Sequence, residues 1–186
     1  MCSPCLQRLA LPTGGLQGSQ PLPWWSCGSY RGALRSQLLG LRRRPDSALL
    51  QALLPALLPP IAALEGEPWL VPVPSWKRRA NPLPELLVQA LSQRSKARGQ
   101  GLLRRSRPVL GQHHLNRTLR ELNQIGSFQA LRPAGAGESR RHPLLVVDDI
   151  LTTGATAFHA AACLEAAGWR VGGLLCLART PAGGGR

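Results

Sequence analysis

The sequence predicts an α/β protein with a mostly parallel sheet flanked by helices, and three features of its C-terminal part support this fold class. Residues 144–147 form an uninterrupted apolar run, which is typical of a strand buried on both faces of a parallel sheet. A helical run over residues 157–167 follows, and Gly168 is placed to end it. Residues 169–178 then give another buried strand, so that a strand, a helix and a strand follow in order.

The chain has 186 residues, of which 44% are hydrophobic, enough to bury one sizeable core with a small appendage. We expect a cysteine-containing N-terminal segment over residues 1–29, a main domain over residues 30–180 and a tail over residues 181–186. Arg179 is expected to begin the frayed end of the chain. Large multidomain architectures are excluded.

The formal net charge of +14 comes almost wholly from arginine, because Lys77 and Lys96 are the two lysines of the chain. Arginine suits bidentate contact with phosphate. A positively charged surface attracts phosphorylated small molecules, nucleic acid or anionic membranes. The charge therefore favours association with anionic partners but does not say which of them the protein binds. A general preference for arginine throughout the chain is the alternative explanation.

The first half of the main domain contains a strand and helices. Residues 24–30 have the composition of a strand, and residues 31–43 predict a helix with its leucines on one face. Arg42 and its neighbouring arginines lie outside that leucine stripe, on a solvated face or along a phosphate-rich groove. Asp46 is placed to cap the next helix.

Residues 47–64 form an uncharged, leucine-rich stretch that is long enough to raise the question of a membrane span. Pro55, Pro59 and Pro60 interrupt it, and they break the backbone hydrogen bonds that a helix exposed to lipid needs. We therefore expect no stable membrane span. The start of the chain has no recognisable secretory signal, so a reducing cytoplasm is the expected location.

The second half of the domain alternates between short strands, helices and basic segments. Residues 68–73 predict a short buried strand, and residues 84–97 predict a helix that ends at Gly99 or Gly101. Residues 127–130 predict another strand. The stretch 133–142 is expected to be a surface linker.

Two aspartates, Asp148 and Asp149, follow the apolar run 144–147 directly. Ionised carboxylates at the end of a buried strand repel each other and lose hydration, so hydroxyl groups, a metal or arginines have to compensate them. The pair therefore predicts a site rather than a piece of core.

The turn after the aspartates consists of small and hydroxyl-bearing residues and leads into the helical run. Its members are Thr152, Thr153, Gly154, Ala155 and Thr156. A helix N-terminus of this kind directs unpaired N–H groups and a positive dipole at one point, which favours phosphate. Together, the carboxylates and the turn predict a ribose 5-phosphate ligand, with the carboxylates on sugar hydroxyls or on hydrated Mg²⁺. Neither a Walker-type P-loop nor a dinucleotide-binding glycine triplet is present.

Residues 146–156 resemble the signature of type I phosphoribosyltransferases, which bind 5-phosphoribosyl 1-pyrophosphate (PRPP) together with Mg²⁺. The resemblance implies that Asp148 and Asp149 are catalytic and contact the ribose 2′- and 3′-hydroxyls. It implies that Thr152 to Thr156 take the 5′-phosphate. Many members of the family have an acidic residue, a candidate general base, where this chain has Thr152.

The same resemblance implies a pyrophosphate loop after the strand at residues 68–73. Its residues would be Pro74, Ser75, Trp76, Lys77 and Arg78. The basic middle of the chain resembles a mobile hood that closes over PRPP and excludes water. Its candidate residues are Arg104, Arg105, Gln112 and Arg117.

The N-terminal segment resembles the zinc-ribbon start of ComF-type phosphoribosyltransferases, a family linked to DNA uptake in natural competence. Cys2 and Cys5 form a Cys-x-x-Cys pair, and Cys27 follows it. A structural zinc site takes four ligands, so these three make a degenerate site and zinc is doubtful.

Three functions are consistent with these features. The first is a ComF-like phosphoribosyltransferase, which transfers phosphoribosyl to a nitrogen acceptor and releases pyrophosphate. The second is a PRPP-binding module without transferase activity, acting in DNA uptake or regulation. The third is a basic nucleic-acid-binding protein, for example for single-stranded DNA, although 4% aromatic residues give little surface for base stacking.

Overall fold

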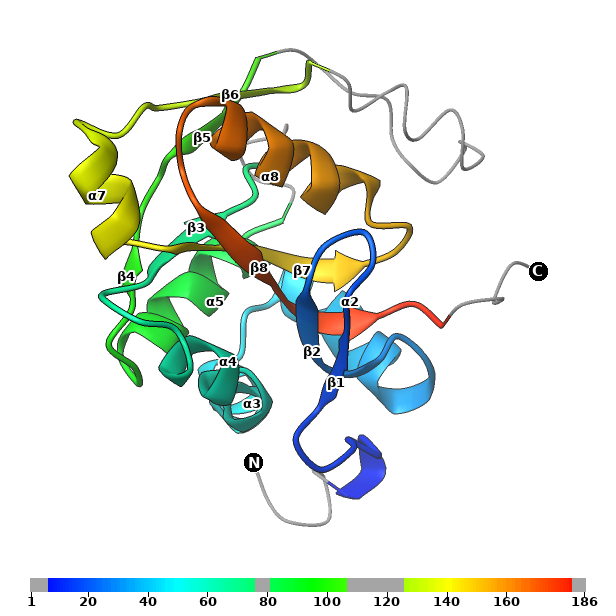
Figure 1. Ribbon diagram of the computed structural model, residues 1–186. Helices are drawn as coiled ribbons and strands as arrows, with labels where there is room; N and C mark the ends of the chain where they lie inside the picture. Colours follow the sequence, from blue (N-terminus) through cyan, green and yellow to red (C-terminus); the bar gives the residue numbers. More distant parts are fainter. Residues whose placement is uncertain (1–6, 76–80, 107–125, 182–186) are drawn as a thin grey trace.

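A six-stranded sheet organises the computed structural model (Figure 1), which describes residues 7–75, 81–106 and 126–181. Its strand order is β1-β2-β8-β7-β3-β4. The strands are β1 (Leu16–Gly18), β2 (Trp24–Ser29), β3 (Trp69–Pro72), β4 (Arg98–Gly99), β7 (Leu144–Leu151) and β8 (Val171–Arg179). β1 is antiparallel to β2, and all other neighbours are parallel. The predicted mostly parallel α/β fold is confirmed.

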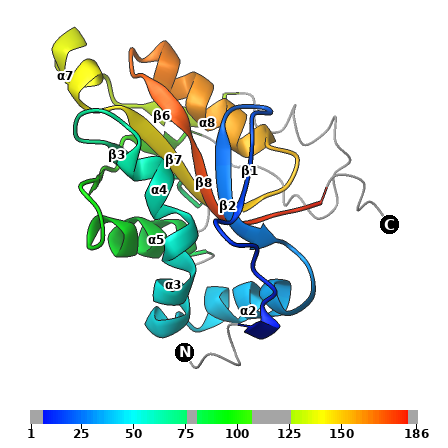
Figure 2. The same ribbon diagram turned by 60° about the horizontal axis from the view of Figure 1, so that its bottom comes forward.

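Helices cover both faces of the sheet (Figure 2). One face carries α2 (Gly32–Arg43), α3 (Ser47–Leu53), the 3₁₀ turn η1 (Leu54–Ala56), α4 (Leu58–Ala62) and α5 (Leu83–Ser92). The other carries α8 (Ala155–Ala166) and the antiparallel hairpin of β5 (Leu103–Arg105) and β6 (Phe128–Ala130). Side chains alternate along β7, so Leu145 and Val147 enter the first core and Leu144 and Val146 the second.

The chain leaves the neighbouring strands β3 and β7 in opposite directions. From β3 it passes through α5 to β4, and from β7 it passes through α8 to β8, with the two helices on opposite faces. Ligands of open parallel sheets bind at such a reversal, beyond the carboxyl ends of the strands. The fold therefore directs attention to the carboxyl ends of β3 and β7.

The N-terminal segment is part of this sheet. β2 pairs in parallel with β8, from Trp24 opposite Leu174 to Ser29 opposite Arg179. The segment predicted for residues 1–29 thus does not form a separate unit where it is described. The predicted leucine stripe of α2 is confirmed, because its three leucines are buried. The predicted cap at Asp46 is confirmed as well, since Asp46 Oδ1 accepts hydrogen bonds from the N–H groups of Ala48 and Leu49.

Two element ends differ from the predictions because pairing between strands continues further than composition suggests. β7 does not end at the aspartates, since Asp148 pairs with Cys176 and Leu151 pairs with Arg179. Arg179 therefore belongs to β8 rather than to a frayed tail.

Three other stretches also differ. The helix predicted for residues 84–97 ends at Ser92, because residues 98–99 pair with β3 as β4. The linker 133–142 contains the short helix α7 (Ala136–Arg141). Within the described residues no helix has both the length and the apolar character needed to span a membrane, and the stretch 47–64 is divided into α3, η1 and α4.

Replacing a core leucine of the central strand should destabilise the fold strongly. Leu145 is fully buried, and we expect Leu145→Ala to lower the free energy of unfolding by about 2–5 kcal/mol, through lost burial and a residual cavity. Leu131, which is 46% exposed, is the matched control, and Leu131→Ala should change stability by less than about 0.5 kcal/mol. Urea denaturation of both variants measures this, and equal losses would contradict the assignment of the core.

Candidate functional site

The turn between β7 and α8 is built around a left-handed glycine at the start of a helix. Gly154 is the N-cap of α8 and has φ +88°, a left-handed conformation that favours glycine. A Cβ atom at this position would lie 2.6 Å from Pro21 Cδ, so the space also requires glycine. Thr153 Oγ1 accepts a hydrogen bond from the Ala155 N–H at 3.3 Å. The predicted turn and helix start are confirmed, and they place the positive end of the α8 dipole beyond the sheet.

Arg179 supports this turn from β8. Its Nη1 donates hydrogen bonds to the carbonyl oxygens of Leu151 and Thr152, and its guanidinium lies over the Trp24 ring, 5.6 Å from the ring centre. Carbonyl oxygens repel phosphate. Because Arg179 binds these two carbonyl oxygens, the N–H groups of the turn are the groups that favour an anion. Sequence reasoning missed Arg179, since its place near the chain end suggested a tail.

The two aspartates point to opposite faces of β7, as alternation along a strand requires. Asp149 faces α2 and is 3% exposed. Arg42 of α2 places both Nε and Nη2 2.6 Å from Asp149 Oδ2. The sequence offered this arginine no particular partner, because 107 positions separate the two residues.

Asp148 faces the hairpin side and is half-buried. Its Oδ1 accepts a hydrogen bond from the Asp149 N–H at 2.8 Å. Burial, and then the neighbouring Asp149 carboxylate, raise the pKa of Asp148 well above its usual range. The two adjacent carboxyl groups thus avoid an unpaired buried charge in different ways. Asp149 is paired with an arginine, whereas the raised pKa of Asp148 favours its protonated, neutral form.

Arg105, a predicted hood residue, lies at the same edge. Its Nε donates to the Pro74 carbonyl oxygen at 3.0 Å, its Nη1 donates to Ser127 Oγ at 3.1 Å, and its guanidinium lies 4.1 Å from the centre of the Phe128 ring. Burial lowers the pKa of Arg105, while the charge of Asp148 opposes this shift. Arg105 therefore connects the end of β3 with the hairpin, near Asp148.

The other predicted residues are described only in part. Pro74 and Ser75 follow β3, beside β7, where the Val73 N–H donates to the Val147 carbonyl oxygen. Trp76, Lys77 and Arg78 of the predicted pyrophosphate loop lie outside the described residues, as do Gln112 and Arg117. Arg104 is exposed on β5, adjacent to Arg105.

The cysteine chemistry does not fit zinc at Cys27. This residue is fully buried in β2, its Sγ donates to the Leu53 carbonyl oxygen, and burial raises its thiol pKa to about 12. Zinc binds thiolate, which this environment disfavours. Cys2 and Cys5 lie outside the described residues, and the described part of the chain contains no group of three or more residues of metal-ligating type.

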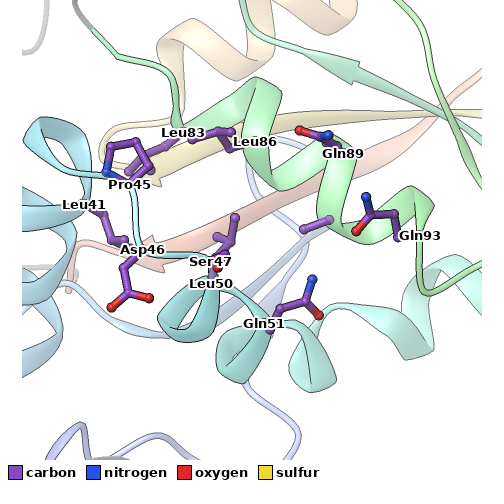
Figure 3. A pocket seen from close by; sticks show the side chains of 11 residues that line it. Leu41, Pro45, Asp46, Ser47, Leu50, Gln51, Leu83, Leu86, Gln89 and Gln93 are labelled. Atoms are coloured by element: carbon purple, nitrogen blue, oxygen red, sulfur yellow. The ribbon is translucent and has the colours of Figure 1, made fainter. Parts of the chain in front are cut away.

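A separate cavity of about 300 Å³ lies among the helices α2, α3 and α5 (Figure 3). Leu41, Leu50 and Leu83 form part of its apolar lining, and the amides of Gln51 and Gln93 lie at its rim. It shares no residue with the β7–α8 turn.

No protein-family model matches the chain, and no curated protein sequence matches it.

Replacing Gly154 should disturb the turn through both backbone strain and a steric clash. We expect Gly154→Ala to lower the free energy of unfolding by more than about 1–2 kcal/mol, the usual cost of a left-handed alanine. Gly14 is a matched control, because it has φ +75° but open space around its missing Cβ. Thermal or urea unfolding should show the smaller loss for Gly14→Ala, and equal losses would show that contact with Pro21 contributes nothing.

The raised pKa of Asp148 predicts a pH-dependent gain of stability on substitution. Above the ordinary pKa of 3.8, the unfolded chain has lost a proton that the folded protein still holds, so ionisation costs stability as the pH rises. We expect Asp148→Asn to raise the free energy of unfolding at neutral pH, with a gain that shrinks towards pH 3.8. Urea midpoints across this pH range measure it, with Asp46→Asn as control because asparagine caps helices as well as aspartate. A gain that does not vary with pH would contradict the assignment.

Proposed function

We propose that this chain binds a 5-phosphorylated ribose, PRPP or ribose 5-phosphate, at the carboxyl end of β7. The observation that carries the proposal is the Gly154 turn at the N-terminus of α8, with the Asp148 carboxylate in the strand that leads into it. The turn suits the 5′-phosphate, through its N–H groups and the threonine hydroxyls of residues 152–156. Asp148 suits a ribose hydroxyl, which can donate to a carboxylate oxygen.

The site also suits Mg²⁺ bound together with a pyrophosphate group. Magnesium usually takes one or two carboxylates and keeps several waters beside substrate phosphates, so it does not need a cluster of protein ligands. The carboxylate of Asp148, in the strand that leads into the turn, would hold it. Bound Mg²⁺ supplies charge neutralisation at the phosphates.

The reaction of this class is displacement of pyrophosphate at ribose C1 by a nitrogen nucleophile. The turn would hold the 5′-phosphate and Asp148 the ribose, which fixes C1 for attack. Cationic groups near the leaving group would stabilise its charge. A ComF-type phosphoribosyltransferase role, linked to DNA uptake, is part of this proposal.

A PRPP-binding module without transferase activity is the second candidate. Two observations favour it: Asp149 is engaged by Arg42, and Thr152 stands where many phosphoribosyltransferases have an acid. Both reduce the number of carboxylates that are available for chemistry at the sugar.

Titration calorimetry with PRPP, with and without MgCl₂, tests the binding proposal. We expect saturable binding that strengthens with Mg²⁺, and a loss of affinity of about tenfold or more in Asp148→Asn, since hydrogen bonds to charged groups contribute about 1.5–3 kcal/mol. Asp46→Asn, a change of the same type on α3, should bind as the wild type does. Absence of PRPP binding by the wild type would refute the proposal.

Pyrophosphate release separates the two candidates. The wild type is incubated with PRPP, Mg²⁺ and a panel of purine, pyrimidine and pyridine bases. Release that depends on a base indicates transfer, whereas binding without release across the panel indicates the non-catalytic module.

A further inference from the structure

Arg42 stands between a buried carboxylate and solvent. Its side chain is 28% exposed and that of its partner Asp149 is 5% exposed. Both contacting nitrogens, Nε and Nη2, approach the same oxygen, Oδ2. At the carboxyl end of β7, the charged group that faces solvent is therefore the Arg42 guanidinium rather than the Asp149 carboxylate.

The sequence of α2 places Arg42 at the carboxyl edge of the sheet. Leu34, Leu38 and Leu41 are buried against the sheet, and Arg42, four positions after Leu38, borders this buried stripe. It lies in the last turn of α2, where the helix dipole favours a cation. Arg43, the next residue, is exposed and has no described ion pair.

We propose that Arg42 is a ligand-binding residue that contacts the anionic group on C1 of the phosphorylated ribose, and that Asp149 is the positioning residue that holds it there. This inference rests on the proposed function. It assigns the ligand to the class of pentose phosphates with anionic groups at both ends. The β7–α8 turn and Arg42 lie on opposite faces of β7, so such a ligand would reach both by crossing the strand end.

The alternative in which the sugar displaces Arg42 from Asp149 is physically unfavourable. A ribose hydroxyl is neutral, and replacing the guanidinium by it would leave a buried carboxylate without counter-charge. An intact pair has no such cost, and the arginine retains further N–H donors for the ligand. A purely stabilising role is a weak explanation as well, because buried ion pairs contribute little net stability compared with apolar packing.

The experiment compares PRPP, which carries pyrophosphate on C1, with ribose 5-phosphate, which does not. Affinities are measured by calorimetry for wild type, Arg42→Ala, Arg42→Lys and Asp149→Asn, with Arg43→Ala as the control of equal charge change on the same helix. Circular dichroism and the unfolding midpoint of each variant establish that it is folded. Asp149→Asn keeps the shape of the side chain and Arg42→Lys keeps the charge, so the test does not depend on the alanine variant.

We expect Arg42→Ala to weaken PRPP binding by about tenfold or more and ribose 5-phosphate binding by less than about threefold. Arg42→Lys should lose part of the PRPP affinity, because lysine lacks the planar fork. Asp149→Asn should also lower the affinity for PRPP more than that for ribose 5-phosphate, since Arg42 is no longer held in place. Arg43→Ala should leave both affinities unchanged.

Other results overturn the inference in distinguishable ways. Tighter binding of either ligand by Arg42→Ala or Asp149→Asn would identify Arg42 as a competitor of the sugar. Equal losses for the two ligands in Asp149→Asn would show that Asp149 contacts the ribose itself. In both cases PRPP binding by the wild type would leave the proposed function standing, whereas a wild type that binds neither ligand refutes both.

Discussion

The structure depends on how two adjacent carboxylates are compensated at the end of a buried strand. Asp148 and Asp149 are in β7, where its pairing with β8 continues and its pairing with β3 has just ended. Asp149 is compensated by a guanidinium from one face, and Asp148 keeps its proton more tightly beside Arg105 on the other. Since an unpaired buried charge is costly, α2 has to deliver Arg42 to this edge, while the raised pKa of Asp148 favours its neutral form.

The turn beside this pair is supported by both ends of the chain. Pro21, in the connection between β1 and β2, lies against Gly154, and Arg179 at the end of β8 holds two carbonyl oxygens of the turn. An anion-binding loop works best when its N–H groups are already oriented before the ligand arrives. Incorporation of the N-terminal hairpin into the sheet thus contributes to the shape of this turn as well as to the fold.

Several elements were predictable because their signals are local. The α2 leucine stripe repeats with the helical period, Asp46 precedes its helix as a cap residue does, and prolines interrupt the stretch 47–64. The end of β7 was not predictable in this way, because composition changes at Asp148 while the hydrogen-bonded pairing with β8 continues to Leu151. Cys27 shows the same limit: spacing groups it with two other cysteines, whereas its own environment is the core beneath η1.

By itself, the sequence determined the fold class, the central strand and the turn that follows it, because each is encoded by neighbouring residues through period, burial and small turn residues. Tertiary structure alone decided that the aspartates face opposite sides of the sheet, that Arg42 pairs with Asp149, and that Arg179 contacts the β7–α8 turn. Those contacts join residues far apart in the chain, and their geometry follows from strand order and helix placement, to which no local pattern is sensitive.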